Sequence, residues 1–385
     1  MILAHKIQLK PTAEQEVQFR MACGVARYTY NWALAEWSRQ YKAGEKPSSY
    51  ALKKQWNQIK PEWVYESPKD ANQAPFAHLQ TAFKNFFKKR AEYPKFHTKG
   101  KKDSFSINND QFCVEGYKAI LPRIGSVKMT EQLRFQGKIM SGTVSRSANH
   151  WFLSINVEMK DYSKPRISDN TEGVDLGVKD PVVLSTGEKF AGPKPLKRLQ
   201  RKLRRLQKSL SRKQKGSSNR KKAIVKLARL HYRIKNIRND FLHKITTKLC
   251  RENQTIVIED LNVKGMMANH CLAKAISDIG FGEFRRQIDY KVKIYTDELK
   301  VASRWFPSTK TCNRCGLIKD MPLSQRTYIC ECGYIADRDV NAAKNLRTLG
   351  LRGIACGHGS SGSTERLNET TVVEAGILKC AEMHT

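Results

Sequence analysis

The alternation of apolar and polar residues first predicts a β module that is interrupted by helices. Residues 2–9 alternate as a strand does, and Thr12 with Gln15 three residues later forms a capping-box pattern that predicts a helix start. Helical spacing of apolar residues then continues, with breaks, to residue 91. Short alternating runs bounded by Gly, Asn and Pro cover residues 105–160 and predict a small antiparallel barrel or sheet.

Residues 171–187, TEGVDLGVKDPVVLSTG, predict two short strands joined by a tight turn. The first of these runs is largely apolar, yet it contains Asp175. An ionised carboxylate is costly in an apolar sheet unless a cation meets it. Asp175 is therefore either a solvated residue at a strand edge or a metal ligand, and this segment alone does not decide between them.

The next segment predicts a cationic helical hairpin. Residues 197–238 contain 18 Lys or Arg and no Asp or Glu. Five leucines from Leu196 to Leu210 keep a 3-4-3-4 spacing, KGSSN at 215–219 breaks the helix, and a second helical pattern follows. A merely solvated face normally mixes both signs of charge, so we favour contact with a phosphate backbone. The residues expected to make it are Arg201, Arg204, Arg205 and Lys208.

The last third of the chain alternates again between strand and helix patterns. TIVIEDL at 255–261 predicts a buried strand that ends in acids, and 281–300 predicts an amphipathic helix. The stretch IADRDVNAAKNLRTLGLRG predicts a loop that enters a helix. Residues 357–385 are rich in small and polar residues, and we expect a flexible tail there.

Composition narrows the class of partner. The 385 residues are 40% hydrophobic, enough for real cores, and carry a formal charge of +34, which favours a polyanionic partner. A membrane is the rival partner, but the sequence has no apolar run of transmembrane length and no N-terminal signal pattern. We therefore expect a cytoplasmic, nucleic-acid-binding protein without a membrane partner, whose scattered cysteines are reduced thiols.

Three acids stand out by their context: Asp175, Glu259 at the end of the TIVIE strand, and Asp339 where a helix begins. An open sheet can bring such residues together at its strand ends. Clustered carboxylates need cations, and oxygen ligands favour Mg²⁺ or Mn²⁺, two of which can support phosphodiester cleavage. The alternative for Glu259 and Asp339 is an ordinary strand-end acid and a helix N-terminal acid.

Four of the ten cysteines fall within 21 residues: Cys312, Cys315, Cys330 and Cys332. Two short turns that each deliver two thiolates suit tetrahedral zinc, although the second pair is one residue tighter than C-x2-C. The alternative is a segment that holds no metal.

These motifs carry a resemblance to a known family. GVDLGVKDPVVLSTG, IVIEDLNVKGM, TCNRCG with YICECG, and DRDVNAAKNL follow one another in the order and spacing found in the TnpB (OrfB) proteins of transposons, relatives of the type V CRISPR effectors. The N-terminal YNWAL and FKNFFKKR segments also resemble that family, so the resemblance covers nearly the whole chain.

The resemblance implies an RNA-guided DNA endonuclease. A guide RNA derived from the transposon end would pair with double-stranded target DNA beside a short adjacent motif. The implied catalytic acids are Asp175, Glu259 and Asp339, with Asp339 preferred to Asp337 because the acid of the family directly precedes x-Asn-Ala. The four clustered cysteines would bind structural zinc, and Gln73 is carried over as a residue that reads the adjacent motif.

The implied fold is a multidomain α+β architecture. An RNase H-like (RuvC) α/β nuclease domain carries a zinc-binding insert, and a β-barrel wedge module carries a helical recognition insert. The expected parts are the first wedge strand (1–10), the recognition helices (11–100), the wedge barrel (101–168), the first nuclease segments (169–307) with the basic hairpin (195–242), the zinc segment (308–336) and the last nuclease segment (337–356).

Two other functions remain open on sequence. A guide-dependent repressor that has lost its chemistry would lack one or more of the acids, whereas all three positions here hold a carboxylate. A strand-transfer transposase would also need an acid triad, but the basic hairpin and the cysteine segment fit a guide-holding nuclease better.

Overall fold

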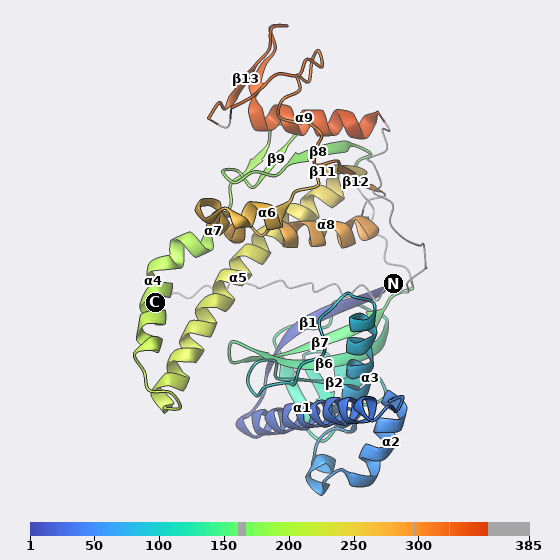
Figure 1. The fold of residues 1–385 in the computed structure, drawn as a ribbon. Helices are drawn as coiled ribbons and strands as arrows, with labels where there is room; N and C mark the ends of the chain where they lie inside the picture. Colours follow the sequence, from blue (N-terminus) through green and yellow to red (C-terminus); the bar gives the residue numbers. More distant parts are fainter. Residues whose placement is uncertain (161–166, 296–297, 323, 353–385) are drawn as a thin grey trace. The chain divides into compact units, whose positions relative to one another are not determined.

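The computed structural model describes residues 1–160, 167–295, 298–322 and 324–352. Two compact units divide the chain, with the boundary at about residue 161 (Figure 1). The tail expected to be flexible at 357–385 lies outside the described residues, so that expectation stays a prediction.

The first unit contains a seven-stranded antiparallel sheet in the order β2-β6-β7-β1-β5-β4-β3. The first strand of the chain is therefore central, as a β module with an insert requires. Among the described residues β2 and β3 do not pair with each other, so closure into a barrel stays a prediction. The strands are β1 (Ile2–Lys10), β2 (Ser104–Asn108), β3 (Cys113–Glu115), β4 (Lys118–Leu121), β5 (Gly125–Met129), β6 (Lys138–Ser147) and β7 (His150–Glu158).

Helices fill the insert between β1 and β2. The capping box is confirmed, because Thr12 accepts a hydrogen bond from the Gln15 backbone and Gln15 bonds back to Thr12. Gln73 lies half-buried in the last of these helices. The helices are α1 (Ala13–Lys42), α2 (Ser49–Ile59), the 3-10 helix η1 (Glu62–Glu66) and α3 (Lys69–Phe87).

The second unit is built on a mixed five-stranded sheet in the order β10-β9-β8-β11-β12. The hairpin predicted at 171–187 is confirmed, since β8 and β9 pair antiparallel. β8, β11 and β12 are parallel neighbours. The strands are β8 (Thr171–Asp175), β9 (Val182–Leu184), β10 (Lys189–Phe190), β11 (Thr255–Glu259) and β12 (Glu298–Ala302).

The helix predicted over 281–300 is too long. α8 (Phe281–Tyr295) ends earlier, and β12 begins at Glu298. ELKVA alternates polar and apolar residues, and each of its five residues pairs with one of β11. The pairing partner lies some 40 residues away in the chain, and such tertiary contacts override local helical periodicity.

Helices cover both faces of this sheet (Figure 1). α5 and α8 pack their apolar residues against the face that contains Val174 and Ile258. On the other face α9 (Arg338–Leu351) lies very close to β8, because a Cβ at Gly173 would stand 2.0 Å from the Ala343 carbonyl oxygen. Only glycine permits this approach, which brings the N-terminal half of α9 to the strand that carries Asp175.

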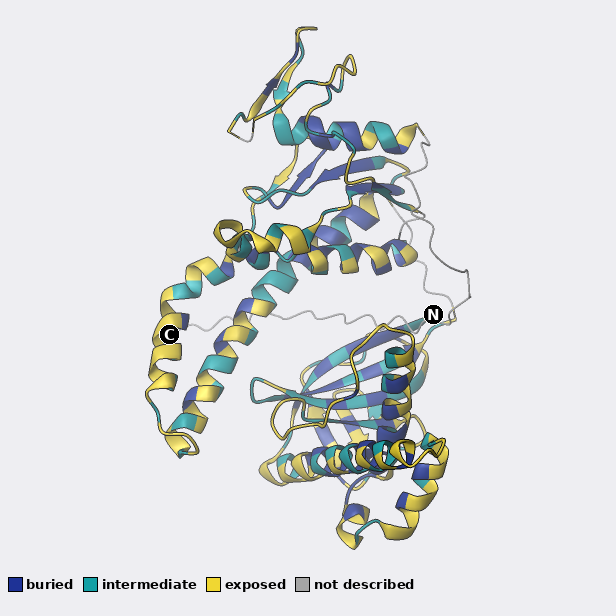
Figure 2. Cartoon of the chain, viewed as in Figure 1, coloured by how far each residue is buried: buried dark blue, intermediate teal, exposed yellow. Residues whose placement is uncertain are grey.

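The predicted basic hairpin is formed by α4 (Pro195–Ser211) and α5 (Ser218–Glu252). Leu203, Leu230 and Ile234 form its own small core. Two further helices follow β11: α6 (Val263–Ala268) and α7 (His270–Ile279). The buried carboxylate of Asp278, near the end of α7, accepts hydrogen bonds from two backbone N–H groups in the first turn of α4. The outward face of α4 is exposed along most of its length (Figure 2).

A buried lysine lies between α8 and α5. Lys291 Nζ donates hydrogen bonds to the carbonyl oxygen of His243 and to the hydroxyls of Thr246 and Thr247, at 2.9, 2.7 and 2.8 Å. Burial lowers the pKa of Lys291 from 10.5 to about 8. The folded protein therefore binds this proton less tightly than the unfolded chain does.

We expect Lys291→Met to raise the free energy of unfolding at pH 7 by about 1–4 kcal/mol, because an apolar chain of similar length replaces a desolvated charge. Wild-type stability rises between pH 8 and 10.5 as the folded and then the unfolded chain lose the proton, so the advantage of the variant should shrink over that range. Urea titrations at pH 7 and pH 10 measure both effects. The exposed neighbour Lys293→Met is the control, and equal stabilisation by it would contradict the prediction.

Candidate active site

The sheet brings Asp175 and Glu259 to the same edge. Val174 and Ile258 pair in the parallel β8–β11 ladder, so the next residue of each strand is the acid. Parallel strands end at the same edge, which is where open α/β sheets bind ligands. Asp175 is 7% exposed and Glu259 is half-buried. The predicted convergence of these two acids is therefore present.

Asp339 is the third acid in electrostatic contact with this edge. Burial first, and then the carboxylates of Glu259 and Asp339, raise the pKa of Asp175 from 3.8 to about 8, while Arg338 opposes the shift. Burial likewise raises the pKa of Glu259, against a hydrogen bond from Ser308. Ionisation of Asp175 is therefore disfavoured at this edge of the sheet unless a cation takes the place of its proton.

Asp339 and Asp337 have different environments. Asp337 is the N-cap of α9, where its carboxylate accepts bonds from the backbone N–H groups of Asp339 and Val340, and it forms an ion pair with Lys189. The charge of Asp339 helps to raise the pKa of Asp175. Its Oδ1 also lies 3.2 Å from Nε of Arg338. Its position supports the choice of Asp339 over Asp337.

The three carboxylates are more widely spaced than the ligands of a single closed site. In the part of the chain that the structure describes, only the clustered cysteines bring three or more potential ligand atoms within 4.8 Å of one another. Asp339 is held by Arg338 and Arg326, and Glu259 accepts a hydrogen bond from the Ser308 hydroxyl. A partly buried, all-oxygen donor set still fits a hard cation such as Mg²⁺ better than a soft one.

The four cysteines form a second site. All four Sγ atoms lie within 4.8 Å of one another, with Cys312 and Cys332 3.7 Å apart and Cys315 and Cys330 3.6 Å apart. Sulfurs bound tetrahedrally at about 2.3 Å from zinc are about 3.8 Å apart. The tight C-x-C spacing therefore does not prevent convergence, and the group fits a thiophilic metal.

Local backbone geometry shapes the cysteine site. β13 (Thr327–Ile329) and β14 (Ile335–Asp337) form the hairpin that presents the second pair. Burial tends to raise the pKa of Cys312, but backbone hydrogen bonds from Cys315 and Arg314 lower it to about 7. A thiol with this pKa is readily available as a thiolate ligand.

Three side chains that the sequence analysis did not select join the two sites. Asn345 Nδ2 donates to the carbonyl oxygens of Ser308 and Thr311, both at 2.7 Å, and Asn341 Nδ2 donates to Thr311 at 2.8 Å. Ser308 in turn binds Glu259. The signal in the sequence was the i, i+4 spacing of the asparagines in NAAKN, which places both on one face of α9.

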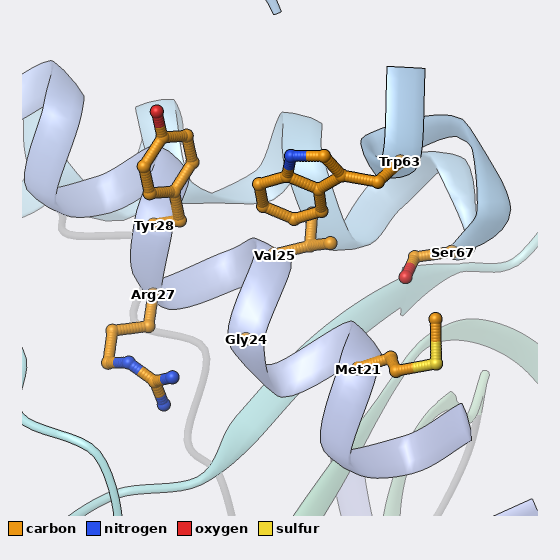
Figure 3. Close-up of a pocket in the computed structure, with 7 residues that line it drawn as sticks. All are labelled: Met21, Gly24, Val25, Arg27, Tyr28, Trp63 and Ser67. Carbon is orange, nitrogen blue, oxygen red and sulfur yellow. The ribbon is translucent and has the colours of Figure 1, made fainter. Parts of the chain in front are cut away.

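The basic residues that were predicted to bind nucleic acid lie on the surface. The four basic residues chosen on α4 are all exposed, as phosphate contact requires. A separate hollow of about 330 Å³ lies in the first unit between α1 and η1, lined mainly by apolar groups such as Met21, Tyr28 and Trp63 (Figure 3). It contains none of the predicted site residues.

Three family models match the chain. OrfB_IS605, described as "Probable transposase", matches residues 154–270, and a "Cas12f1-like, TNB domain" matches 281–346. A "Helix-turn-helix domain" of the same OrfB group matches 1–46. In the structure that last stretch forms β1 and the single long helix α1 rather than a helical pair.

The mixed α and β fold of this chain is similar to that of a solved structure. It resembles the Cas12f1 chain in a cryo-EM complex of Cas12f1 with sgRNA and target DNA, with a TM-score of 0.56 at 16% identity, covering 87% of this chain and 83% of that one. No described helix is long and apolar enough to cross a membrane.

Sequence relatives identify the family. A Streptomyces pristinaespiralis protein named "Putative RNA-guided DNA endonuclease" is 39% identical, covering 92% of this chain and 91% of its own. The Escherichia coli protein "Putative RNA-guided DNA endonuclease InsQ" is 34% identical, covering 97% and 98%. This chain belongs to the TnpB (OrfB) family, as its motifs predicted.

Proposed function

We propose that this chain is a transposon-encoded RNA-guided DNA endonuclease. The observation that carries the proposal is the meeting of Asp175 and Glu259 at one edge of a parallel strand pair, with Asp339 close enough to raise the pKa of Asp175. The names of the relatives at 39% and 34% identity agree with this function. The formal charge of +34 suits two nucleic-acid partners, a guide RNA and a DNA duplex.

The nuclease would be of the RuvC type, with Asp175, Glu259 and Asp339 as ligands for Mg²⁺ or Mn²⁺. When bound, the cations would activate water and stabilise the leaving oxygen of the phosphodiester. Asp175 would have to give up its proton to become a ligand, so cleavage should become more effective as the pH rises toward 8. Ser308 holds the Glu259 carboxylate in place, and Asp339, which now contacts Arg338 and Arg326, would be the third ligand of the cations.

The cysteine cluster would bind one structural zinc. The short Sγ distances and the fully thiol donor set support zinc. Because this segment is hydrogen-bonded to α9 and its loop binds Glu259, the metal would stabilise both supports of the catalytic acids. Zinc here is structural and takes no part in the reaction.

The remaining partner assignments follow the domain organisation. We assign the α4–α5 hairpin to the backbone of the guide RNA or of the RNA–DNA heteroduplex, and the helical insert to recognition of the motif adjacent to the target. Gln73 is the proposed motif-reading residue, and its half-buried place on α3 leaves part of the side chain accessible.

Changing the four exposed basic residues of α4 to Gln should weaken guide-RNA binding and flatten its salt dependence by about three units of slope, since each phosphate contact contributes about 0.7–0.9. Preference among guide sequences should not change, because phosphate contacts carry no sequence information. The leucine seam and helix propensity are kept. Filter-binding titrations from low to high salt measure the slope. The quadruple variant combines Arg201, Arg204, Arg205 and Lys208.

A control variant removes the same charge from exposed lysines of the first unit. If both quadruple variants flatten the slope equally, net charge rather than the hairpin determines binding. If the α4 variant keeps the wild-type slope, its basic face is only solvated. The control replaces Lys10, Lys42, Lys118 and Lys128, all exposed, with Gln.

The function is tested by isolating and sequencing the RNA that copurifies with the protein, and then changing its guide portion. A discrete RNA from the transposon end, and cleavage that follows the new guide sequence, are the expected results. Cleavage that ignores the guide would refute the proposal. Binding without cleavage would indicate the inactive repressor, and joined DNA strands would indicate the transposase that the "Probable transposase" description suggests.

A further inference from the structure

Trp305 is 85% exposed, far more than any other large apolar side chain of the second unit that the structure describes. It lies in the turn that follows β12, and the last residue of that strand, Ala302, pairs with Glu259 in the β11–β12 ladder. Trp305 is thus three residues beyond Ala302, which is the strand neighbour of the proposed catalytic acid Glu259. Isolated exposed apolar residues are common, so exposure alone carries no conclusion and the surroundings must decide.

The turn that presents Trp305 is held at both ends. The Trp305 backbone N–H donates to Ser303 Oγ at 3.3 Å, and the Phe306 N–H donates to the Ser303 carbonyl at 2.9 Å. The Phe306 ring packs into the core with Val257 and Leu346. Beyond it Ser308 bonds to Glu259. The segment around Trp305 is therefore anchored by the Phe306 ring and by the bond from Ser308 to Glu259, while the indole stays exposed.

The neighbouring residue adds charge. Arg304 Nε donates to Asp260 Oδ2 at 3.0 Å, so the guanidinium is fixed one residue beyond Glu259 and remains about half exposed. A cation beside an exposed indole is the combination with which proteins bind single-stranded nucleic acid, since the base stacks on the ring and the phosphate meets the cation. Carboxylates at the same edge would repel a phosphate without such help.

We propose that Trp305 is a stacking platform for a base of the DNA strand being cut, and that Arg304 contacts the adjoining phosphate. The inference rests on the proposed nuclease function and adds the residue that places the strand at the three acids. Every base has a stacking face, so the contact would be independent of sequence. Trp305 is a positioning residue, because it does not touch the reacting phosphate.

We expect Trp305→Ala to raise the KM for target DNA about 5- to 150-fold, the range expected for loss of one stacked base, with a smaller change in kcat. Trp305→Phe should recover most of the loss, because it restores an aromatic face. Tyr117→Ala, which removes a 53% exposed aromatic ring between β3 and β4, outside the helical insert, is the matched control and should behave as wild type. Guide-RNA binding should be equal in all four proteins.

A direct readout uses the fluorescent base 2-aminopurine, placed at one DNA position at a time in complexes of the non-cleaving Asp175→Asn protein. One or two positions beside the cut site should be quenched when Trp305 is present and brighter in the Trp305→Ala complex. Wild-type cleavage that follows the guide, together with unchanged KM and no position sensitive to Trp305, would overturn this inference while leaving the nuclease function intact. Absence of guided cleavage by wild type would instead refute both.

Discussion

Asp175→Asn should abolish divalent-dependent DNA cleavage while leaving guide-RNA and target binding unchanged. Removing one ligand from a metal site forfeits several kcal/mol of transition-state stabilisation, which corresponds to a loss of about a thousandfold or more. Asn keeps the shape of the side chain and its place at the end of β8. Single-turnover cleavage with Mg²⁺ and with Mn²⁺, beside binding titrations, measures the two effects separately.

The same substitution should stabilise the protein when divalent ions are chelated. Because the folded pKa of Asp175 is raised from 3.8 to about 8, the folded state binds this proton more tightly than the unfolded chain does. Wild-type stability therefore falls as the pH rises from about 4 to 8, whereas Asn does not ionise. Melting curves in EDTA at pH 5 and pH 8 should show an advantage of the variant that is larger at pH 8.

Asp337→Asn is the matched control, two residues before Asp339. Asn is also a good N-cap, so α9 should remain intact, and only the exposed ion pair with Lys189 is lost. Cleavage should stay near the wild-type rate. Wild-type cleavage by the Asp175 variant, or a loss in the Asp337 variant equal to that of Asp339→Asn, would show that the acids are wrongly assigned.

The parts of the fold that local chemistry determines could be predicted from the sequence. β-branched runs predicted β8, β9 and β11, and a capping box predicted the start of α1. The leucine seam predicted the α4–α5 pair, whose small core contains Leu203 and Leu230. In each case the signal depends only on residues within a few positions of one another, whether it is a polar cap, a β-branched run or a spacing of leucines.

The contacts that assemble the site depend on partners far apart in the chain. β12 was assigned to a helix because its pairing with β11 is not visible locally. Gly173 permits the close approach of α9, but its role appears only when Ala343 is known to lie against it. The motifs could nominate Glu259, whereas the hydrogen bond from Ser308 that fixes it depends on the path of the chain after β12.

Cys330→Ser should lower both the zinc content and the cleavage activity. The cysteine segment has only a small apolar cluster, formed around Cys312, Tyr328 and Cys330, which is too little buried area to fold such a stretch unaided. We therefore expect wild type to contain one zinc per chain by elemental analysis and the variant to contain far less. The pKa of Cys330 is raised, with burial opposing a backbone bond from Cys332, so a metal must displace its proton.

The loss of activity should exceed about tenfold, because disturbing the shell around a site commonly costs 10- to 100-fold and here a direct ligand is removed. The physical route runs from Thr311, beside Cys312, to Asn341 and Asn345 on the helix of Asp339, and from Ser308 to Glu259. RNA binding should fall much less. The exposed Cys113→Ser is the control and should keep zinc and activity. Wild type without zinc, or a zinc-free variant with full cleavage, would mean that hydrogen bonds alone hold the acids in place.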